Sequence, residues 1–372
     1  MLSEEHIGHI RTLAPPLLSL YLSVNPARPE NQGRAYLLRA REAMEATGAP
    51  PEVRQRVLAA LEEPPRAKTR ALFATADRLE AYDLQVELPL LEGVEAHWGE
   101  PYLTPLLYVL DEYERVGVVF LDSEKWRLFE VYLGEIEEIS GAFRAVDPQA
   151  WRRLTQDQTG RRYGPGGAQR AAPDTDHLEQ RLAVWTQRFY KEAAAQLEQA
   201  MRERGLGRLI LMGPKAEVSA FEAALPRRLR ERVAATLPSL PSPNAQASEV
   251  LRAVEEVLEP LERAREVRLL EELVERGVAG LEQTLELLQQ GRLHTLVAPW
   301  RPAGRVYQAQ DGWVALSPEA ARAHGEPIRE LELKQVLPEL TAAYGTRLEL
   351  VRGPAEERLR QELGGLAGLL RW

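Results

Sequence analysis

The sequence predicts an α/β (α+β) protein of three domains: an N-terminal α+β domain, a middle domain with a mixed sheet and a projecting glycine-rich loop, and a C-terminal α/β sandwich. The chain has 372 residues, more than a single hydrophobic core usually organises. Short apolar runs typical of strands alternate with longer amphipathic stretches typical of helices. Segments rich in proline and glycine divide the chain into residues 1–103, 104–240 and 241–372.

Composition narrows the classes of function. Apolar residues make up 44% of the chain and charged residues 28%, which is typical of a folded soluble protein. No stretch approaches the roughly 20 apolar residues that span a bilayer, and the first residues lack the pattern of a secretion signal. Cysteine is absent, so we expect a cytoplasmic protein with no membrane partner. A net charge of −9 argues against general binding of DNA or other polyanions.

The first domain is expected to begin with a helix over Ser3–Leu13, which Ser3 caps and Pro15 ends. A strand is expected over Leu17–Val24, which is short and mostly apolar. The further elements expected in this domain are helices over Gly33–Thr47 and Pro51–Leu61 and strands over Arg70–Ala76 and Leu79–Leu88. Prolines and glycines in residues 89–101 then predict a linker.

The middle domain is expected to open with an antiparallel meander, because three strand-like runs are separated by charged, turn-prone pieces. These runs are Leu106–Leu110, Gly117–Leu121 and Trp126–Leu133. A loop-rich stretch over Ala142–Pro173 follows, and Thr175–Arg204 has apolar residues at three- and four-residue steps, which predicts a long helix. A buried strand over Arg208–Pro214, a helix over Ala216–Ala224 and a strand over Arg232–Thr236 complete the domain.

A proline-rich linker over Leu237–Gln246 introduces the third domain. Its expected helices are Ser248–Arg276, Gly280–Gln290 and Glu330–Tyr344. Its expected strands are His294–Trp300, a hairpin-like pair around Asp311-Gly312, Arg347–Arg352 and a terminal helix-to-strand segment.

The glycine-rich loop RRYGPGGAQR over Arg161–Arg170 is locally basic. Residues 151–170 contain five arginines and one acidic residue, Asp157, which gives a local charge of +4 in an acidic chain. The arginines are Arg152, Arg153, Arg161, Arg162 and Arg170. Because the guanidinium fork suits phosphate, we expect these side chains to contact RNA. A solvated loop without a ligand is the alternative.

Residues 105–372 resemble the archaeal and eukaryotic peptide-chain release factors and the Pelota-type ribosome rescue factors. The resemblance is carried by TLELLQQGRLHTLVAPW over Thr284–Trp300, by YGTRLELV over Tyr344–Val351 and, most specifically, by the tail GGLAGLLRW over Gly364–Trp372. It implies a middle domain that projects a Gly-Gly-Gln loop and a third domain with a helix–strand core. It also implies the ribosome and tRNA as partners, together with a translational GTPase.

In that family the Gly-Gly-Gln loop promotes hydrolysis of the peptidyl-tRNA ester. The corresponding residues here are Gly166, Gly167 and Gln169, which the resemblance makes the catalytic candidates, with no cofactor. Ala168 intervenes, so the motif reads GGAQ, and one extra residue moves the glutamine by up to roughly 3.5 Å along an extended chain. The alternative is therefore a non-catalytic, Pelota-like factor that binds the ribosome or RNA.

A third hypothesis is a metal-dependent nuclease, since Asp111, Glu112, Asp122 and Glu124 are expected at strand ends. His6 and His9 are three residues apart, but no further metal ligand stands near them in the sequence, so no metal site is expected. The third domain of many relatives carries a CxxC metal knuckle, which this cysteine-free chain lacks. The first domain has no loop like the family's codon-reading Asn-Ile-Lys-Ser, so stop-codon recognition is not expected.

Overall fold

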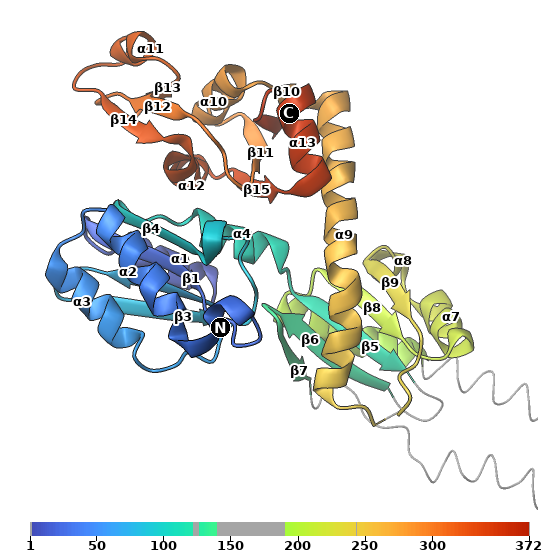
Figure 1. Ribbon diagram of the computed structural model, residues 1–372. Helices are drawn as coiled ribbons and strands as arrows, with labels where there is room; N and C mark the ends of the chain where they lie inside the picture. The colour runs from blue at the N-terminus through green and yellow to red at the C-terminus, as the bar shows by residue number, and fades with distance from the viewer. Residues whose placement is uncertain (1, 122–125, 140–189, 243, 372) are drawn as a thin grey trace, which may run out of the picture. The chain divides into compact units, whose positions relative to one another are not determined.

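The computed structural model describes residues 2–121, 126–139, 190–242 and 244–371 (Figure 1). These residues form a mixed α/β structure with four sheets, which confirms the predicted fold class. The chain divides into two compact units, one made of residues 1–113 together with 259–372 and the other of residues 114–258. The division into three domains at the predicted boundaries stays a prediction. Among the described residues, no helix is long and apolar enough to cross a membrane.

The first sheet belongs to the N-terminal part of the discontinuous unit. Its strand order is β3-β2-β1-β4 and every neighbouring pair is antiparallel. The elements are α1 Glu4–Arg11, β1 Leu17–Ser23, α2 Tyr36–Ala46, α3 Pro51–Ala60, β2 Thr69–Ala74, β3 Leu79–Leu84 and β4 Val94–Gly99, with 3-10 turns at Pro29–Arg34 and Leu91–Gly93. Helices α2 and α3 cover one face, where Leu18, Leu20 and Leu22 of β1 pack with Met44 and Val57. The interior strand β1 is therefore mostly apolar, as predicted, and its buried polar residue is Ser19.

The predicted linker over residues 89–101 is wrong in part, because it contains β4. This strand pairs with β1 from Val94 to Gly99 and forms an edge of the sheet. Its side chains are all half-buried, so the sequence VEAHWG shows no apolar alternation. Gly93 and Gly99 have φ values of +76° and +139°, which glycine adopts without strain. The glycines thus mark the two ends of a strand rather than an extended linker.

The predicted strand over Leu106–Leu110 is also wrong: residues Thr104–Glu112 form helix α4. A short apolar run fits a buried strand or a buried helix equally well by its pattern. Pro105 occupies the first turn of the helix, where its missing N–H costs nothing. Leu106 and Val109, three residues apart, then point to the same side and are buried.

The sheet of the second unit is mixed, as predicted. Its order is β7-β6-β5-β8-β9, with an antiparallel meander over β5, β6 and β7 and parallel pairing of β8 with β5 and β9. The elements are β5 Val116–Leu121, β6 Trp126–Tyr132, β7 Glu135–Glu138, a helix described over residues 190–204, β8 Arg208–Met212, α7 Lys215–Ala224, α8 Arg227–Arg230 and β9 Val233–Leu237. The long helix α9, Ala247–Arg276, begins in this unit and continues into the other.

The C-terminal part of the discontinuous unit has two sheets, ordered β10-β16-β11-β15 and β13-β12-β14. Its elements are β10 Val278–Ala279, α10 Leu281–Gln289, β11 Leu293–Pro299, β12 Arg305–Gln308, β13 Val314–Ala315, α11 Pro318–Arg322, β14 Arg329–Glu332, α12 Leu333–Ala343, β15 Arg347–Val351, α13 Gly353–Glu362 and β16 Ala367–Leu370. The second half of α9 and α13 pack on Val297 and Val351 of the larger sheet.

The glycines of the tail are used for close packing. Gly364 and Gly365, with φ values of +68° and +84°, connect α13 to β16. Strand β16 lies between β10 and β11, and a Cβ on Gly368 would lie 2.8 Å from Leu293 Cδ1 and 3.0 Å from the Thr295 carbonyl oxygen. A larger residue at this position has no room. The tail is therefore an interior strand of its sheet.

Candidate functional site

All eight predicted site residues lie outside the described residues, because Gly166, Gly167, Gln169 and the five loop arginines fall between positions 140 and 189. The described residues on either side are β7, which precedes this segment, and the helix over residues 190–204, which follows it. We call these two elements, together with the sheet on which they lie, the frame, because they flank residues 140–189 in the sequence.

The frame is a three-layer structure. On one face of the mixed sheet, Leu197 of the helix packs with Leu128 of β6 and Leu211 of β8. On the other face, Val250 and Val254 of α9 pack on the sheet, and Figure 1 shows the start of α9 lying across β5 and β6. Because both faces are covered by fully buried side chains, the sheet is a rigid support.

Ion pairs join the strand before the loop to the helix after it. Arg204, on the helix, lies 3.1 Å from Glu137 of β7 and 3.2 Å from Glu130 of β6. The Glu130 side chain is only 4% exposed and also pairs with Arg115, whose guanidinium lies 4.0 Å from the centre of the Tyr132 ring. The hydrogen bond to Glu137 raises the pKa of Arg204. These ion pairs thus fix the far end of the helix over residues 190–204 to strands β6 and β7.

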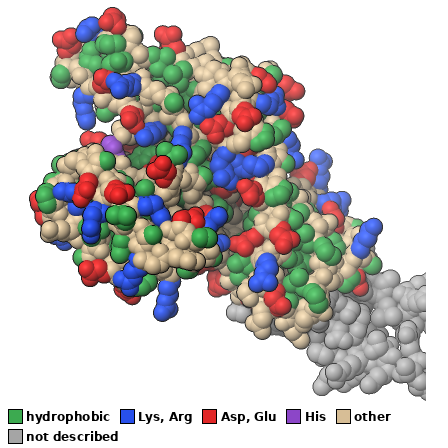
Figure 2. Space-filling model, viewed as in Figure 1, with side chains coloured by type: hydrophobic (Ala, Val, Ile, Leu, Met, Phe, Trp, Pro, Cys, Tyr) green, Lys and Arg blue, Asp and Glu red, His purple; other side chains and the backbone are tan. Residues whose placement is uncertain are grey.

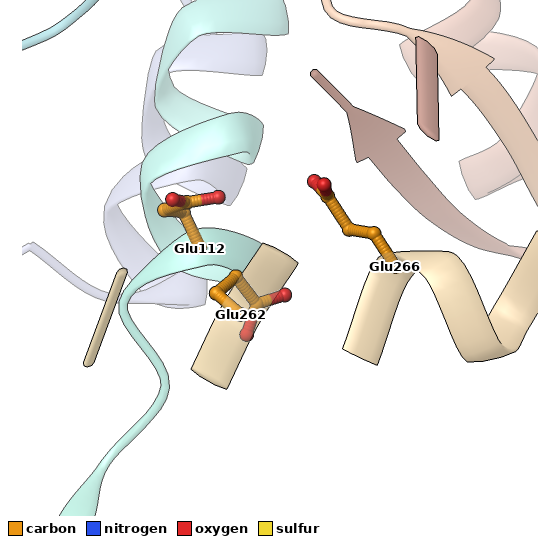
Figure 3. Close-up of side chains that lie close together, drawn as sticks. All are labelled: Glu112, Glu262 and Glu266. Atoms are coloured by element: carbon orange, nitrogen blue, oxygen red, sulfur yellow. The ribbon is translucent and has the colours of Figure 1, made fainter. Parts of the chain in front are cut away.

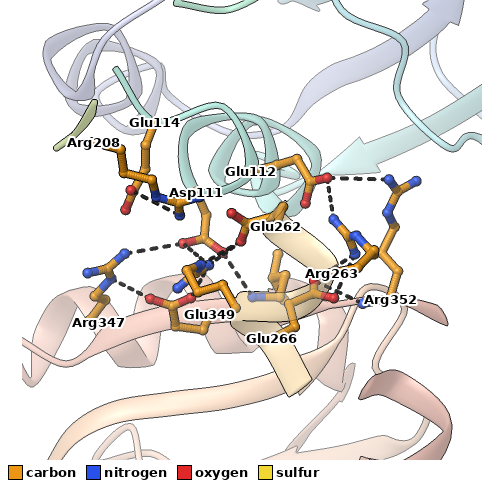
Figure 4. Close-up of polar contacts among 12 residues, drawn as sticks. Asp111, Glu112, Glu114, Arg208, Glu262, Arg263, Glu266, Arg347, Glu349 and Arg352 are labelled. Atoms are coloured by element: carbon orange, nitrogen blue, oxygen red, sulfur yellow. Dashed lines mark hydrogen bonds and ion pairs between the residues drawn. The ribbon is translucent and has the colours of Figure 1, made fainter. Parts of the chain in front are cut away.

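The arginine–carboxylate cluster is the densest group of buried charge in the described residues, and it lies in the discontinuous unit (Figure 4). Its members are Asp111, Glu112, Glu262, Arg263, Arg265, Glu266, Arg347, Glu349 and Arg352. They come from the last turn of α4, from the middle of α9 and from β15 with the residue after it. The cluster therefore connects three segments that are far apart in the sequence.

Arg263 and Arg265 are the centres of two adjoining groups in this cluster. Nη1 of Arg263 donates to both carboxylate oxygens of Glu266 at 2.7 Å, and its Nη2 donates to Glu112. Nη2 of Arg265 lies 2.6 Å from Glu262 and 2.7 Å from Glu349. Removing either arginine would leave two buried carboxylates without their main partner, which is costly in a low dielectric.

Two acids of the cluster, Asp111 and Glu266, have raised pKa values. Burial raises the pKa of Glu266 to about 8, against the lowering effect of Arg263. Burial, followed by the charge of Glu349, also raises the pKa of Asp111 well above its usual range, against the lowering effect of Arg265. Burial would lower the pKa of Arg265, but its hydrogen bond to Glu349 and the neighbouring negative charge raise it. Asp111 and Glu266 thus hold a proton more tightly than free carboxyl groups do.

Three carboxylates of this cluster have the spacing of a metal site. Oxygen atoms of Glu112, Glu262 and Glu266 lie within 4.8 Å of one another (Figure 3). Each of them is already paired: Glu112 and Glu266 with Arg263, and Glu262 with Arg265. A cation would have to replace these guanidinium groups, so the arrangement fits an ion-pair network and not a metal centre.

The nuclease hypothesis receives no support from this geometry. It placed Asp111 and Glu112 at a strand end, whereas both lie in the last turn of α4 and face arginines. Asp122 and Glu124 lie outside the described residues. Sequence analysis singled out Asp111 and Glu112 but missed their partners; those of Glu112, Arg263 and Arg352, follow at separations of 151 and 240 residues.

The face of the molecule shown in Figure 2 carries no large patch of one charge. On the face shown in Figure 2, Lys and Arg side chains are interspersed with Asp and Glu. The arginines of α8 illustrate this: Arg227 pairs with Glu231 at 2.7 Å, and Arg230 donates to backbone carbonyls at the end of α7. Residues 151–170, with a local charge of +4, therefore differ from this face, on which charges of both signs are mixed.

Comparison with known proteins identifies the family. Residues 101–259 match the model of bacterial archaeo-eukaryotic release factor family 10. Over 204 residues the chain is 26% identical to peptide chain release factor subunit 1 of Methanopyrus kandleri, covering 53% of this chain and 46% of that relative. Residues 101–259 of this chain belong to the bacterial branch of the archaeo-eukaryotic release factors. The chain spans about half the length of the curated relative that it matches.

Solved structures of this superfamily are similar to the chain at low identity. Pelota of Archaeoglobus fulgidus is 16% identical, with 82% of this chain and 79% of that chain covered and a TM-score of 0.33. Pelota in a model of ribosome-bound archaeal Pelota and ABCE1 is 16% identical, with 99% and 93% covered and a TM-score of 0.43. At these scores whole chains superpose only in part, so the superfamily assignment rests on the sequence matches.

Proposed function

We propose that this protein is a ribosome-associated release or rescue factor that promotes hydrolysis of the peptidyl-tRNA ester. The observation that carries the proposal is the family match over residues 101–259, because this range contains the GGAQ loop and the whole frame around it. The relative from Methanopyrus kandleri is by its name a peptide chain release factor subunit. The frame supports the proposal because the strand before residues 140–189 and the helix after them are fixed on one sheet, where Arg204 pairs with Glu137 and Leu197 packs on the sheet.

In the proposed mechanism, Gly166 and Gly167 allow the backbone to come close to the ester, since glycine has no side chain and accepts positive φ. Gln169 positions the attacking water, and a backbone N–H beside it stabilises the negative charge that develops on the ester oxygen. Ala168 stands between the glycines and the glutamine. A displacement of about 1 Å costs on the order of 100-fold in rate, so the position of Gln169 decides the activity.

The proposed partners are the ribosome and tRNA, with delivery by a translational GTPase. Arg152, Arg153, Arg161, Arg162 and Arg170 are assigned to phosphates of ribosomal RNA or tRNA, and no cofactor is assigned. Each phosphate contact releases counterions, so binding to ribosomes is expected to weaken as salt rises. No stop-codon reading is assigned to the first domain.

The test is release of labelled peptide from purified stalled ribosomes, after co-sedimentation at two salt concentrations. Wild-type protein is expected to bind stalled ribosomes preferentially and to release peptide. Gln169→Ala is expected to lose release by about 100-fold or more while binding persists, and the matched variant Gln158→Ala is expected to behave as wild type. Equal release by wild type and Gln169→Ala would refute the catalytic assignment.

The second candidate is a non-catalytic, Pelota-like factor, and the inserted Ala168 favours it. In this case the protein binds stalled ribosomes but no peptide is released, and Gln169→Ala changes nothing. Deletion of Ala168 restores the spacing Gly-Gly-Gln and separates the two candidates: a gain of release from an inactive wild type would show that the insertion is what removed the activity.

A further inference from the structure

The first sheet has an open edge that the proposed function does not use. Strand β3 stands at the end of the order β3-β2-β1-β4, and its six residues, Leu79–Leu84, pair with β2 in unbroken register. The Thr75 N–H donates to the Arg78 carbonyl oxygen, and hydrogen-bonded pairs alternate along an antiparallel ladder. Every second residue after Arg78 therefore bonds to β2, whereas Ala81 and Asp83 direct their backbone groups away from it.

A groove of about 540 Å³ follows this edge. One wall is formed by consecutive residues of β3, Glu80–Leu84. Because neighbouring side chains of a strand point to opposite faces, what these residues share is the backbone edge. The other wall is helix α1, which contributes Glu5, His6 and His9. A strand edge beside a helix is the arrangement in which some domains bind an extended peptide by strand addition.

Two other edge strands of the same unit have side-chain partners. Glu95 of β4 pairs with Arg301 at 2.6 Å, and the Leu350 N–H of β15 donates to the Asp111 carboxylate at 3.4 Å. Among the described residues, no such contact reaches the backbone groups of β3 that point away from β2. This strand also contains no proline, lysine or bulge, the features that commonly protect an exposed edge. Its edge is therefore available for pairing.

The lining of the groove is acidic. Of the described residues, Glu5, Glu80 and Asp83 line it, and neither Lys nor Arg does. Asp83 is paired with Arg70 at 3.0 Å. The Glu80 side chain is 36% exposed, and its Oε1 lies 3.3 Å from Nε2 of the exposed His9. Glu5 and Glu80 are thus the carboxylates that an incoming chain meets, and they favour a cationic one.

We propose that the edge of β3 and the groove beside it bind an extended basic segment of a partner protein, which adds to the first sheet as a further strand. Backbone hydrogen bonds to Ala81 and Asp83 hold the segment. Side chains on the α1 side of the added strand meet Glu5 and Glu80, so lysine or arginine is favoured at every second position. The small side chain of Ala81 leaves room for apolar residues at the positions between. This surface is separate from the residues assigned to peptide release.

The experiment is fluorescence polarisation of a labelled peptide in which lysine and valine alternate, matched in length to the six residues of β3 and titrated with the full chain. Saturable binding that weakens with salt is expected, and the same peptide with glutamate in place of lysine is expected not to bind. Two N-methylated peptides test strand addition, one methylated at every valine and one at every lysine. Their affinities should differ by about tenfold or more, because an added strand turns only one of these sets toward β3.

Variants of the chain locate the site. Ala81→Pro removes an N–H that points away from β2 and should weaken binding by about tenfold or more, since an edge strand tolerates proline at such a position. Glu5→Gln and Glu80→Gln should each weaken binding by about threefold. The matched control is Glu42→Gln, which makes the same change of charge at an exposed position of α2 outside the groove and should leave binding unchanged.

The outcomes are distinct. Unequal binding of the two N-methylated peptides, with weakening in Glu80→Gln but not in Glu42→Gln, supports the proposal. Equal binding of the two peptides overturns strand addition, and this result does not depend on whether Ala81→Pro folds. Equal weakening in Glu80→Gln and Glu42→Gln overturns the site, because net charge alone would then attract the peptide. A dimer in sedimentation equilibrium that Ala81→Pro abolishes, without peptide binding, also overturns it, since a second copy would then occupy the edge.

Discussion

Replacing Arg263 by methionine should strongly destabilise the discontinuous unit. Arg263 has a side chain only 20% exposed, and it donates to Glu112 and to both oxygens of Glu266. Methionine keeps most of the apolar volume and removes the charge, so Glu112 is left with Arg352 alone and Glu266 loses its hydrogen-bond donor in a buried place. Breaking a buried pair in this way costs about 3–5 kcal/mol, a large part of the roughly 5–15 kcal/mol that stabilises a typical protein.

The assay is thermal unfolding of the full chain, followed by calorimetry so that the transitions of the two units can be separated. For a unit of about 150–250 residues, 1 kcal/mol corresponds to about 2–4 °C, so the midpoint of the discontinuous unit should fall by about 6–20 °C. The matched control is Arg358→Met on α13, whose partner Glu362 is half exposed; this variant should leave the midpoint nearly unchanged. Equal midpoints for the two variants would refute the reasoning, because the carboxylates would then be relaxing into water.

Three further outcomes are expected. The pKa of Glu266 is raised from 4.5 to about 8, so its contribution to stability is complete below pH 4.5 and lost as the pH rises through 8. Glu266→Gln cannot ionise, so its melting midpoint should fall less than that of the wild type over this pH range. Equal pH dependence of the two midpoints would contradict this expectation. Gly368→Ala should destabilise by about 1–3 kcal/mol in urea unfolding, because its Cβ has no room, whereas Gly8→Ala, in an open helical position, should not destabilise. Leu197→Ala should cost about 2–5 kcal/mol, and calorimetry should show this in the transition of residues 114–258 alone; a shift of both transitions would count against independent units.

Most elements were predictable because their patterns are local. Two strands could be predicted because most of their residues are apolar, namely Leu17–Ser23 and Arg208–Met212. The predicted start of the long helix over Ala247–Arg276 differs from the observed start by one residue. The errors at Thr104–Glu112 and Val94–Gly99 have the same origin. In both places the pattern was short or half-buried, and tertiary packing decided the structure.

The charged sites could not be predicted, because their members meet only in the fold. Asp111 and Glu112 were noticed as acidic residues, but nothing local indicates that arginines from α9 and β15 will surround them. Likewise His6 and His9 are close together in the sequence, whereas Glu80, which pairs with His9 in the fold, lies in a strand 71 residues after His9. The residues of the GGAQ loop were identified by resemblance alone and stay a prediction.

The interruption of one unit by another dictates an order of folding during synthesis. Residues 114–258, with their complete sheet, leave the ribosome before the C-terminal strands of the discontinuous unit exist. Until the later arginines are made, neither acidic residue at the end of α4 is neutralised: Glu112 pairs with Arg263 and Arg352, and Asp111 with Arg265 and Arg347. In the nascent chain, the unit of residues 114–258 can therefore fold while the carboxylates at the end of α4 still lack their arginine partners. The discontinuous unit is complete only when residues 259–372 have packed with residues 1–113.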